Sequence, residues 1–359
     1  MKIGVVLPAL ERMPPTRMNP EGQFAHSLAS QLVKMGHHIT SFGSRKNSGF
    51  HRHISLPYES KLEQHDRTLD HSSIKYASQR ALTALAIRAL NEGSVDILHS
   101  HHSTLMDLSL TAQKPIVSTV HFGLSDEAVT KLPLLFLAYN GFPNVTFVCI
   151  SSHQASRFEK TLPLKTQHVI PSGIDVGSFG FSAEKENHLL WLGRISPEKQ
   201  PHLAIEVALQ AQVPLILAGP NSSTEQADSE YFDRCIRPHL ANEKIKYINT
   251  IDYSQRNNLL SRSRATLFTS SSSDALGMTI MESLASGTPV YALNGNAASE
   301  LILDTHTGYV GHSTADLARE IVKDQYTDYL EIRRYAETAF SIKKCAQRYE
   351  ELYSSLLNI

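Results

Sequence analysis

Short apolar runs alternate with helical patterns along almost the whole chain. In the first half, Phe24, Leu28 and Leu32 recur at helical spacing, and Gly36 ends that helix. A second, alanine- and leucine-rich helix is predicted at 77–90. Apolar runs typical of buried strands lie at residues 2–7, 38–42, 95–99, 115–121, 145–150 and 167–170. This alternation predicts parallel strands joined by crossover helices.

The second half shows the same pattern. Its predicted strands lie at 188–192, 215–218, 245–248, 265–269 and 289–292, and its predicted helices at 200–211, 254–262, 279–286 and 314–323. The glycine-containing stretch 174–187 is the predicted hinge. We therefore expect an α/β protein of two Rossmann-like domains, residues 1–175 and 176–340. A C-terminal helix at about 341–359 is expected to pack back on the first domain. Two such sheets should bind a ligand in the cleft between the carboxyl ends of their strands.

Length and composition agree with two globular domains. The chain has 359 residues, 41% of them hydrophobic and 19% charged. Its formal net charge of -1 supplies no basic field, which argues against a nucleic-acid partner. The three cysteines, Cys149, Cys235 and Cys345, are far apart and odd in number. They exclude a disulfide framework and favour a cytoplasmic protein.

Two stretches bear on membrane contact. Residues 132–150 carry no charge, but Pro133, Gly141 and Pro143 interrupt them, so no transmembrane span is predicted. Residues 61–90 carry two more basic than acidic side chains, which leaves peripheral membrane contact open. The apolar pattern within this stretch favours packing in the core instead.

A first candidate site follows the predicted strand 188–192. The segment Gly193-Arg-Ile-Ser-Pro-Glu-Lys199 leads from that strand into a helix. Arg194 offers a planar fork of donors and Lys199 a mobile charge, a combination suited to a diphosphate. The alternative is a pair of solvated surface cations.

A second candidate site lies between the predicted strand 265–269 and the next helix. Asp274 stands in the loop and Glu282 in the helix, where their carboxylates can accept hydrogen bonds from sugar or ribose hydroxyls. The backbone N–H groups of Gly277, Met278 and Thr279 should point out of the helix N-terminus and form an anion site. The alternative makes Asp274 a helix cap and Glu282 a surface residue.

Together these stretches resemble the retaining glycosyltransferases of family 4, which have the two-domain GT-B fold. Residues 193–199 match the family's donor-phosphate segment, and Asp274 to Glu282 match its Glu-x7-Glu motif. Further matching segments follow in the family's order at residues 96–101, 118–121, 150–152, 169–175, 285–290, 300–302 and 308–310.

The resemblance implies a role for each matched residue. Arg194 and Lys199 would neutralise the diphosphate of a nucleotide-sugar donor, and Glu282 would hold the ribose. Asp274 would bind hydroxyls of the transferred sugar, and His121 would face that sugar from the first domain. The implied enzyme is a hexosyltransferase that uses a UDP-sugar as co-substrate and needs neither a cofactor nor a metal.

This chain departs from the family in two places. Asp274 stands where the family usually has glutamate, one methylene longer, which puts the identity of the sugar in doubt. The family's N-terminal loop often carries a Gly-Gly pair beside the donor phosphate, and here only Gly22 is available. Arg17, in the same loop, is an alternative source of charge and more simply a solvated side chain.

Histidines form the remaining conspicuous cluster. The run His99-Ser-His-His102 resembles a metal site but lacks a third ligand at a fixed spacing. We expect these histidines to line the acceptor side of the cleft. His51 and His53 fall in a polar, irregular segment and are expected at the surface.

Several functions remain open at this point. The same fold could support nucleotide-sugar epimerisation or glycogen-type synthesis. A non-catalytic nucleotide-sugar-binding protein would also fit Asp274 and the altered N-terminal loop. The acceptor, whether a sugar, a lipid-linked sugar or a small molecule, is not indicated by any motif in the loops at 45–75 and 122–143. The residues also leave open whether the reaction passes through an ion-pair-like path or a covalent intermediate.

Overall fold

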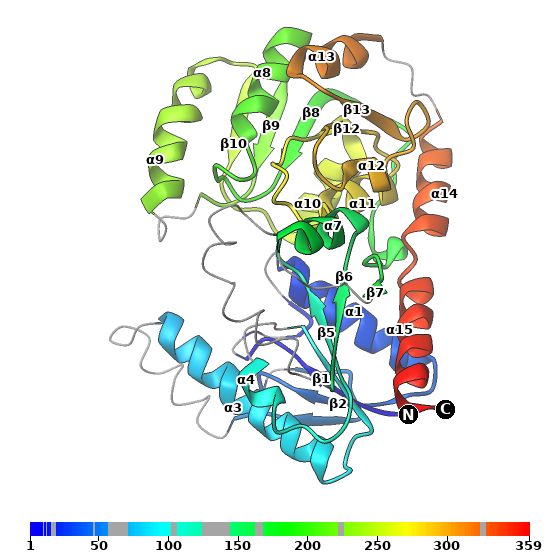
Figure 1. The fold of residues 1–359 in the computed structure, drawn as a ribbon. Coiled ribbons are helices and arrows are strands. Elements are labelled where there is room, and N and C mark those ends of the chain that lie inside the picture. The colour runs from blue at the N-terminus through cyan, green and yellow to red at the C-terminus, as the bar shows by residue number, and fades with distance from the viewer. Residues whose placement is uncertain are drawn as a thin grey trace.

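The computed structural model shows two lobes, each with a parallel sheet between helices (Figure 1). It describes residues 1–9, 11, 13–15, 19–45, 47–56, 71–101, 106–123, 144–161, 168–221, 226–323 and 328–359. The expected α/β architecture with two Rossmann-like sheets is confirmed.

The first sheet has seven parallel strands in the order β3-β2-β1-β4-β5-β6-β7. They are β1 (Lys2–Val6), β2 (His38–Phe42), β3 (Arg52–Ile54), β4 (Ile97–Ser100), β5 (Ile116–Val120), β6 (Val145–Cys149) and β7 (His168–Val169). Within the described residues of this half, the helices are α1 (Pro20–Lys34), α3 (His71–Asn91), α4 (Met106–Ser109) and α7 (Ser152–Thr161).

Strand β3 corrects the expectation of an irregular segment around His51 and His53, whereas His51 is exposed as expected. It pairs in parallel with β2, and the ring of His53 lies 2.8 Å from the hydroxyl of Ser41. The segment lacks an apolar run, so the sequence pattern does not predict a strand. It becomes one because its backbone pairs with the edge of the sheet that β2 would otherwise leave open.

The two faces of the first sheet pack against different helices. Ile3 and Val5 of β1 face α1 and α15 (Ile342–Leu357), whereas Val6 faces α3. Alternate residues of a strand point to opposite faces, and burial on both faces makes these strands continuously apolar. Leu82, Ala86 and Leu90 of α3 lie in this core, as the sequence pattern favoured.

The second sheet has six parallel strands in the order β10-β9-β8-β11-β12-β13. They are β8 (Glu186–Leu192), β9 (Leu215–Ala218), β10 (Ile245–Ile248), β11 (Ser263–Phe268), β12 (Val290–Leu293) and β13 (Gly308–Gly311). Leu189 and Trp191 pack into one helical layer, and Leu190 and Leu192 into the other.

Seven helices of the second half surround this sheet within the described residues. They are α8 (Pro201–Ala211), α9 (Gln226–Cys235), α10 (Tyr253–Arg262), α11 (Met278–Ala285), α12 (Ala298–Leu301), α13 (Thr314–Lys323) and α14 (Tyr329–Ala339). The sequence pattern missed α9, α12 and α14. Helix α9 is strongly polar, and only Tyr231 and Phe232 of its apolar side chains are buried against the domain.

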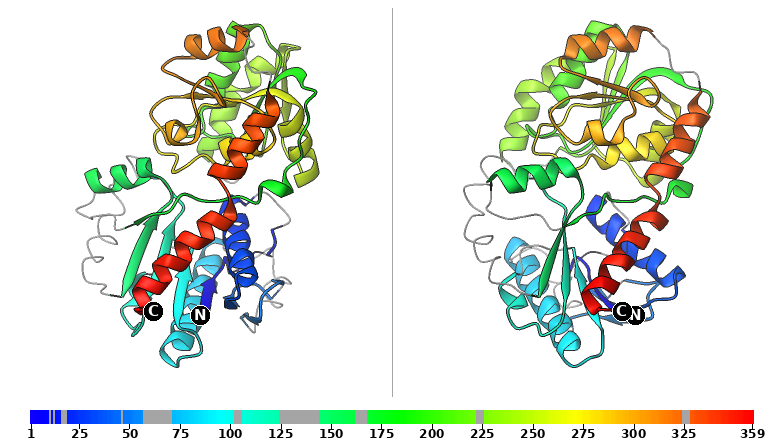
Figure 2. Two further views of the ribbon diagram at one scale, coloured as in Figure 1. Left: turned by 90° about the vertical axis from the view of Figure 1, so that its right-hand side faces the viewer. Right: turned by 45° about the vertical axis from the view of Figure 1, so that its right-hand side comes forward.

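The chain crosses between the lobes twice, at residues 170–186 and again between α14 and α15. The crossings meet where the N–H of Ile174 donates to the carbonyl of Phe340 at 2.8 Å, and the N–H of Ile342 donates to the carbonyl of Ile174 at 3.1 Å. Gly173 is required here, because a Cβ would lie 2.7 Å from the Cα of Ile342. Beyond this point α15 runs along the first lobe against α1, which brings the two termini close together (Figure 2).

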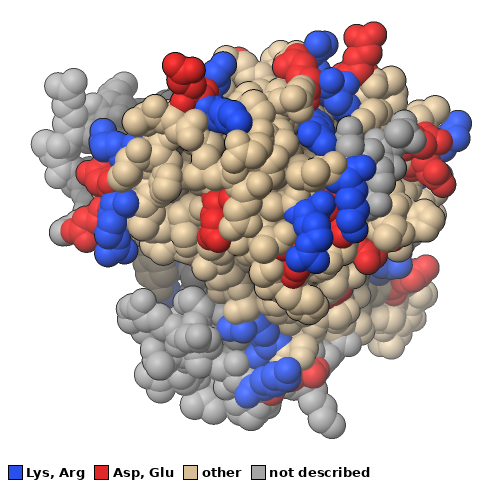
Figure 3. Space-filling model, turned by 90° about the horizontal axis from the view of Figure 1, so that it is seen from above, with Lys and Arg blue, Asp and Glu red and all other residues tan. Residues whose placement is uncertain are grey.

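The outer surface is of mixed charge. Basic and acidic side chains are interspersed on the face seen from above (Figure 3), consistent with the formal net charge of -1. None of the helices in the described part of the chain combines the length and the apolarity needed to cross a bilayer. The three cysteines are free thiols.

Candidate active site

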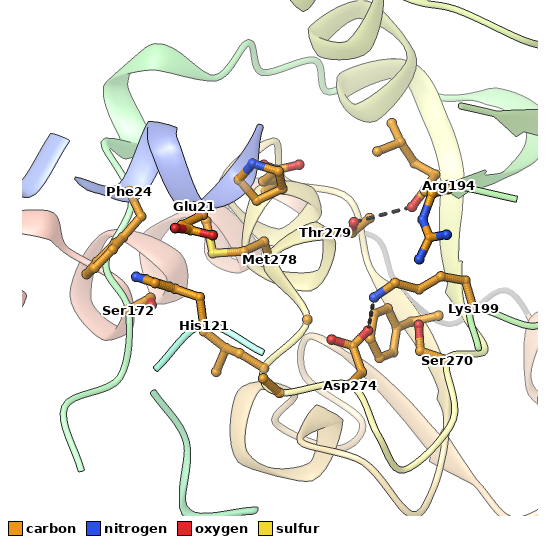
Figure 4. A pocket seen from close by; sticks show the side chains of 18 of the residues that line it. Glu21, Phe24, His121, Ser172, Arg194, Lys199, Ser270, Asp274, Met278 and Thr279 are labelled. Carbon is orange, nitrogen blue, oxygen red and sulfur yellow. Dashed lines mark hydrogen bonds and ion pairs between the residues drawn. The ribbon is translucent and has the colours of Figure 1, made fainter. Parts of the chain in front are cut away.

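A cleft of about 650 Å³ opens between the two lobes at the carboxyl ends of their strands. The second lobe contributes residues that follow β8 and β11, and the first contributes residues of α1 and the residues after β5. This is where ligands bind in open parallel sheets. Figure 4 shows Glu21, Phe24, His121 and Ser172 on one side of the cleft, across from Arg194, Lys199 and Asp274.

Both predicted phosphate-binding cations line the cleft, and each has a carboxylate partner. The guanidinium of Arg194 donates to Asp228 at 2.6 Å, and the ammonium of Lys199 donates to Asp274 at 2.6 Å. Asp228 and Asp274 are largely buried, with side-chain exposures of 6% and 12%. The two carboxylates hold the side chains of Arg194 and Lys199 in place.

The loop after β11 leads into the N-terminus of α11. Gly277 has φ of +93°, a conformation that favours glycine, and its missing Cβ would lie 3.0 Å from the ring of Phe268. Met278 and Thr279 begin the helix and line the cleft together with Gly277. N–H groups of a first helical turn have no partner within the helix, as the predicted anion site requires.

Glu282 also lines the cleft, but deeper, in a buried ion pair. Its carboxylate lies 3.1 Å from the guanidinium of Arg256, and the two side chains are 4% and 3% exposed. Arg256 also lies over the rings of Phe179 and Tyr253. Burial raises the pKa of Glu282, while Arg256 acts in the opposite direction.

Rings form much of the first-lobe wall. His121 follows β5, and its Nε2 lies 2.9 Å from Nδ1 of His101. Both imidazoles meet the ring of Phe24 edge-on, with centroids 5.8 Å away for His101 and 5.4 Å away for His121. These three side chains line the cleft together.

His99 does not line the cleft, contrary to the expectation for the histidine run. Its side chain is fully buried, hydrogen-bonded to Thr119 at 2.7 Å and to Tyr353 of α15 at 2.6 Å. Burial lowers the pKa of His99 to about 3, and His121 acts in the same direction. His102 lies outside the described residues. Within the described parts of the chain, no group of three or more His, Cys, Asp or Glu side chains is placed to hold a metal ion.

Gly22 of the N-terminal loop lies in a different place from the one expected for it. Gly22 lies in the first turn of α1, where its N–H donates to the side chain of Asn19 at 2.9 Å, and it is not among the residues that line the cleft. A Cβ at this position would lie 2.6 Å from the side chain of Met13, so the glycine permits close packing of the loop. Arg17 lies outside the described residues.

Glu21, next to Gly22, is a cleft residue that the sequence analysis missed. Burial raises its pKa to about 7, Glu11 adds to the rise, and Lys75 opposes it. The carboxyl group therefore keeps its proton to a higher pH than an exposed glutamate does.

Asp228, Arg256 and Phe24 were missed as well, and no local signal marks them. Asp228 lies 34 residues after Arg194 in a polar helix, and Arg256 lies 26 residues before Glu282. In the sequence, Phe24 cannot be distinguished from the other apolar residues of α1. Only the packing of separate elements brings each of them to the site.

Two family profiles match consecutive parts of the chain. The Glycosyltransferase Family 4 profile matches residues 22–178, and the profile of glycosyl transferases group 1 matches residues 179–339. No curated protein matches the sequence.

Solved structures share the fold at low sequence identity. AviGT4, a glycosyltransferase involved in avilamycin A biosynthesis, is 21% identical, covers 100% of this chain and 98% of its own, and has a TM-score of 0.73. HepE of Anabaena, solved with UDP-glucose, is 18% identical, covers 99% and 100%, and has a TM-score of 0.71. The sucrose-phosphate synthase of Thermosynechococcus elongatus is 15% identical, covers 100% and 99%, and has a TM-score of 0.75.

The expected family is thereby confirmed. The two profiles run without a gap from residue 22 to residue 339, and they meet within the segment that connects the lobes. The chain belongs to the glycosyltransferases of the group 1 and family 4 type and has their GT-B fold.

Proposed function

We propose that this protein is a retaining glycosyltransferase that moves a hexose from a UDP-sugar to an acceptor bound by the first lobe. One observation carries the proposal. Arg194, Lys199 and Asp274 converge beside the open N-terminus of α11, across the cleft from His121. This arrangement offers positive charge to a diphosphate and a carboxylate to sugar hydroxyls in one continuous space. The complex of HepE with UDP-glucose supports the choice of donor.

In the proposed reaction, the bond between C1 of the sugar and the donor phosphate oxygen breaks, and its electron pair leaves with the diphosphate. A hydroxyl oxygen of the acceptor bonds to C1, and the hydroxyl proton passes to the departing phosphate. Negative charge grows on the diphosphate as the bond breaks. Arg194, Lys199 and the first N–H groups of α11 stabilise that charge, which is the strongest kind of assistance in a site shielded from water.

The remaining residues bind and orient. Glu282 accepts hydrogen bonds from the ribose, and Asp274 exchanges its contact with Lys199 for contacts with the sugar once the diphosphate attracts the ammonium. His121 faces the sugar from the first lobe. We propose that two side-chain cations make a metal unnecessary, and that the free thiols and nucleotide donor belong to a cytoplasmic enzyme.

The test is nucleotide release from a panel of UDP-, GDP- and ADP-sugars, with and without cell extract as a source of acceptor. We expect release from one UDP-sugar, a rise with extract, and no loss of rate in EDTA. NMR of the product anomer then tests retention. Loss of rate in EDTA would overturn the metal-free proposal, and an inverted anomer would overturn the retaining one.

The alternatives predict different outcomes of the same panel. An epimerase converts one nucleotide sugar into another without an acceptor and without release. A non-catalytic binder binds UDP but releases nothing, and activity that appears only in Asp274→Glu would identify it, since Asp274 is the shorter carboxylate. Neither release nor binding would contradict the phosphate site assigned to Arg194 and Lys199.

A further inference from the structure

The first turn of α7 reaches both halves of the cleft without lining it. Ser151, which directly precedes α7, and His153 and Gln154 of its first turn are not among the described residues that line the cleft. Their side chains nevertheless bond to the two segments that carry His121 and Asp274. Figure 1 shows α7 at the boundary of the two lobes, directly against the second one.

Gln154 holds the segment that carries His121. Its side chain is 1% exposed, and its amide nitrogen donates to the carbonyls of Val120 at 3.0 Å and Phe122 at 2.7 Å. Its amide oxygen accepts from the N–H of Ile150 at 2.8 Å. The two carbonyls flank His121, so the amide fixes the backbone on both sides of that residue. A buried amide with all of these bonds made resists displacement.

Ser151 and His153 hold the loop that carries Asp274. The hydroxyl of Ser151 donates to the carbonyl of Ala275 at 2.5 Å. Nε2 of His153 donates to the carbonyl of Ser272 at 2.8 Å. These carbonyls bracket Asp274, as those of Val120 and Phe122 bracket His121.

Glu300 of α12 fixes the same turn from the second lobe. Its carboxylate accepts from the backbone N–H of Ser152 at 2.9 Å and from that of His153 at 2.5 Å. An anion at a helix N-terminus is stabilised both by these charge-assisted bonds and by the helix dipole. The lobes also meet where a Cβ on Gly123 would lie 1.4 Å from the carbonyl oxygen of Ser273, so only glycine fits there.

We propose that the first turn of α7 sets the position of His121 relative to Asp274, with His153 and Gln154 as positioning residues and Glu300 as the group that fixes the turn. The inference rests on the proposed function, because it assigns these residues to the transfer of a sugar held between His121 and Asp274. The loop around Asp274 receives its bonds from α7 only while the lobes are together. Closure of the lobes therefore completes the sugar site, whereas the phosphate site around Arg194 lies within the second lobe and forms without α7.

The experiment compares wild type, His153→Phe and His153→Gln. Phenylalanine keeps a ring but removes the N–H that the carbonyl of Ser272 accepts, and glutamine restores an N–H at the end of the side chain. The measurements are kcat and KM for donor turnover, and Kd for UDP and for the UDP-sugar that the donor panel selects. Gln154→Met removes the second set of bonds, and Glu159→Gln, on an exposed part of the same helix, is the control.

We expect His153→Phe to lower kcat about tenfold or more, since small misplacements of reacting groups carry large losses in rate. Its affinity for the UDP-sugar should fall while that for UDP stays within about twofold, since no phosphate contact changes. His153→Gln should recover most of the kcat and most of the affinity for the UDP-sugar. Gln154→Met should behave like His153→Phe, with its melting temperature recorded because Gln154 is buried.

A His153→Phe protein with wild-type kcat and wild-type UDP-sugar affinity overturns the inference. Equal losses of UDP and UDP-sugar affinity also overturn it, because they indicate general damage to the second lobe. A wild type that binds the UDP-sugar but releases no nucleotide overturns the proposed function instead, and the ratio of the two affinities in the variants still decides the positioning role. A wild type that binds neither compound overturns both.

Discussion

The two walls of the cleft are built on different chemistry. The second-lobe wall carries, among apolar side chains, charges that are already paired: Arg194 with Asp228, Lys199 with Asp274, and Arg256 with Glu282. The first-lobe wall is formed largely by rings, with Phe24 against His101 and His121, and it includes one carboxyl group, Glu21, whose pKa is raised by burial to about 7.

This difference follows from what each wall is proposed to bind. A diphosphate demands positive charge, and isolated cations in a partly buried cleft would repel one another. Pairing each cation with a carboxylate keeps the empty site stable. The proposed acceptor presents a hydroxyl group to the donor sugar, and rings can bind the rest of the acceptor without fixed charge. Donor turnover should therefore be most sensitive to substitutions that remove a charge from the second-lobe wall. Acceptor binding should be most sensitive to substitutions that change the shape of a ring in the first-lobe wall.

The largest expected effect is on stability, at the buried pair of the charged wall. Arg256→Met leaves Glu282 buried without its partner and should lower the free energy of unfolding by about 3–5 kcal/mol. Chemical denaturation measures the loss. The double variant Arg256→Met with Glu282→Leu should regain part of it, because no buried charge remains. If the double variant is as unstable as the single one, the loss comes from packing around Phe179 and Tyr253 rather than from charge.

The next effect is on turnover. Lys199→Ala removes one cation from the leaving diphosphate and should lower kcat about 10²-fold or more, or about 2.7 kcal/mol. Steady-state kinetics with the selected UDP-sugar measure it. Lys343→Ala, at an exposed position of α15, is the matched control and should leave kcat unchanged. Unchanged turnover in Lys199→Ala would contradict the role of this residue.

A smaller effect is expected at the carboxyl group of the ring wall, and it depends on pH. The folded-state pKa of Glu21 is about 7, above the ordinary value of 4.5, so the folded protein holds this proton more tightly than the unfolded chain. The stabilisation is complete below about pH 4.5 and is lost as pH rises toward 7. Relative to wild type, Glu21→Gln should become more stable by about 1–2 kcal/mol between pH 5 and pH 8. A stability difference that does not vary over this range would show that Glu21 titrates normally.

The smallest effect tests shape on the ring wall. Phe24→Leu keeps an apolar side chain but removes the surface against which His101 and His121 pack, and it should cost under about 1.5 kcal/mol of stability. KM for the acceptor should rise while Kd for UDP stays constant, because Phe24 belongs to the opposite wall from the phosphate site. Calorimetry with UDP and kinetics with extract-derived acceptor measure the two quantities. A weaker Kd for UDP with an unchanged acceptor KM would reverse the assignment of the walls.

The sequence alone determined the fold and the charged wall to a large extent. Short apolar runs, such as the four residues Leu189–Leu192 that end β8 and the four residues of β9, form strands that are buried on both faces, so their pattern can be recognised in the sequence. Arg194 and Lys199 stand within one short segment, as do Asp274 and Glu282, and the strand-to-helix turns that carry them are local structures. Local structure is what a sequence pattern encodes.

The tertiary structure alone decided which side chains from distant parts of the chain contact one another. Asp228 meets Arg194 from a helix whose apolar pattern is weak, and Glu300 reaches His153 across 147 residues. Strand β3 forms because it pairs with the edge of β2, and His99 is buried because α15 covers it. The hydrogen bonds of α7 to the loop around Asp274 form because the second lobe supplies that loop. The free energy of such contacts depends on distances that no local pattern records, because they exist only once both lobes have folded and met.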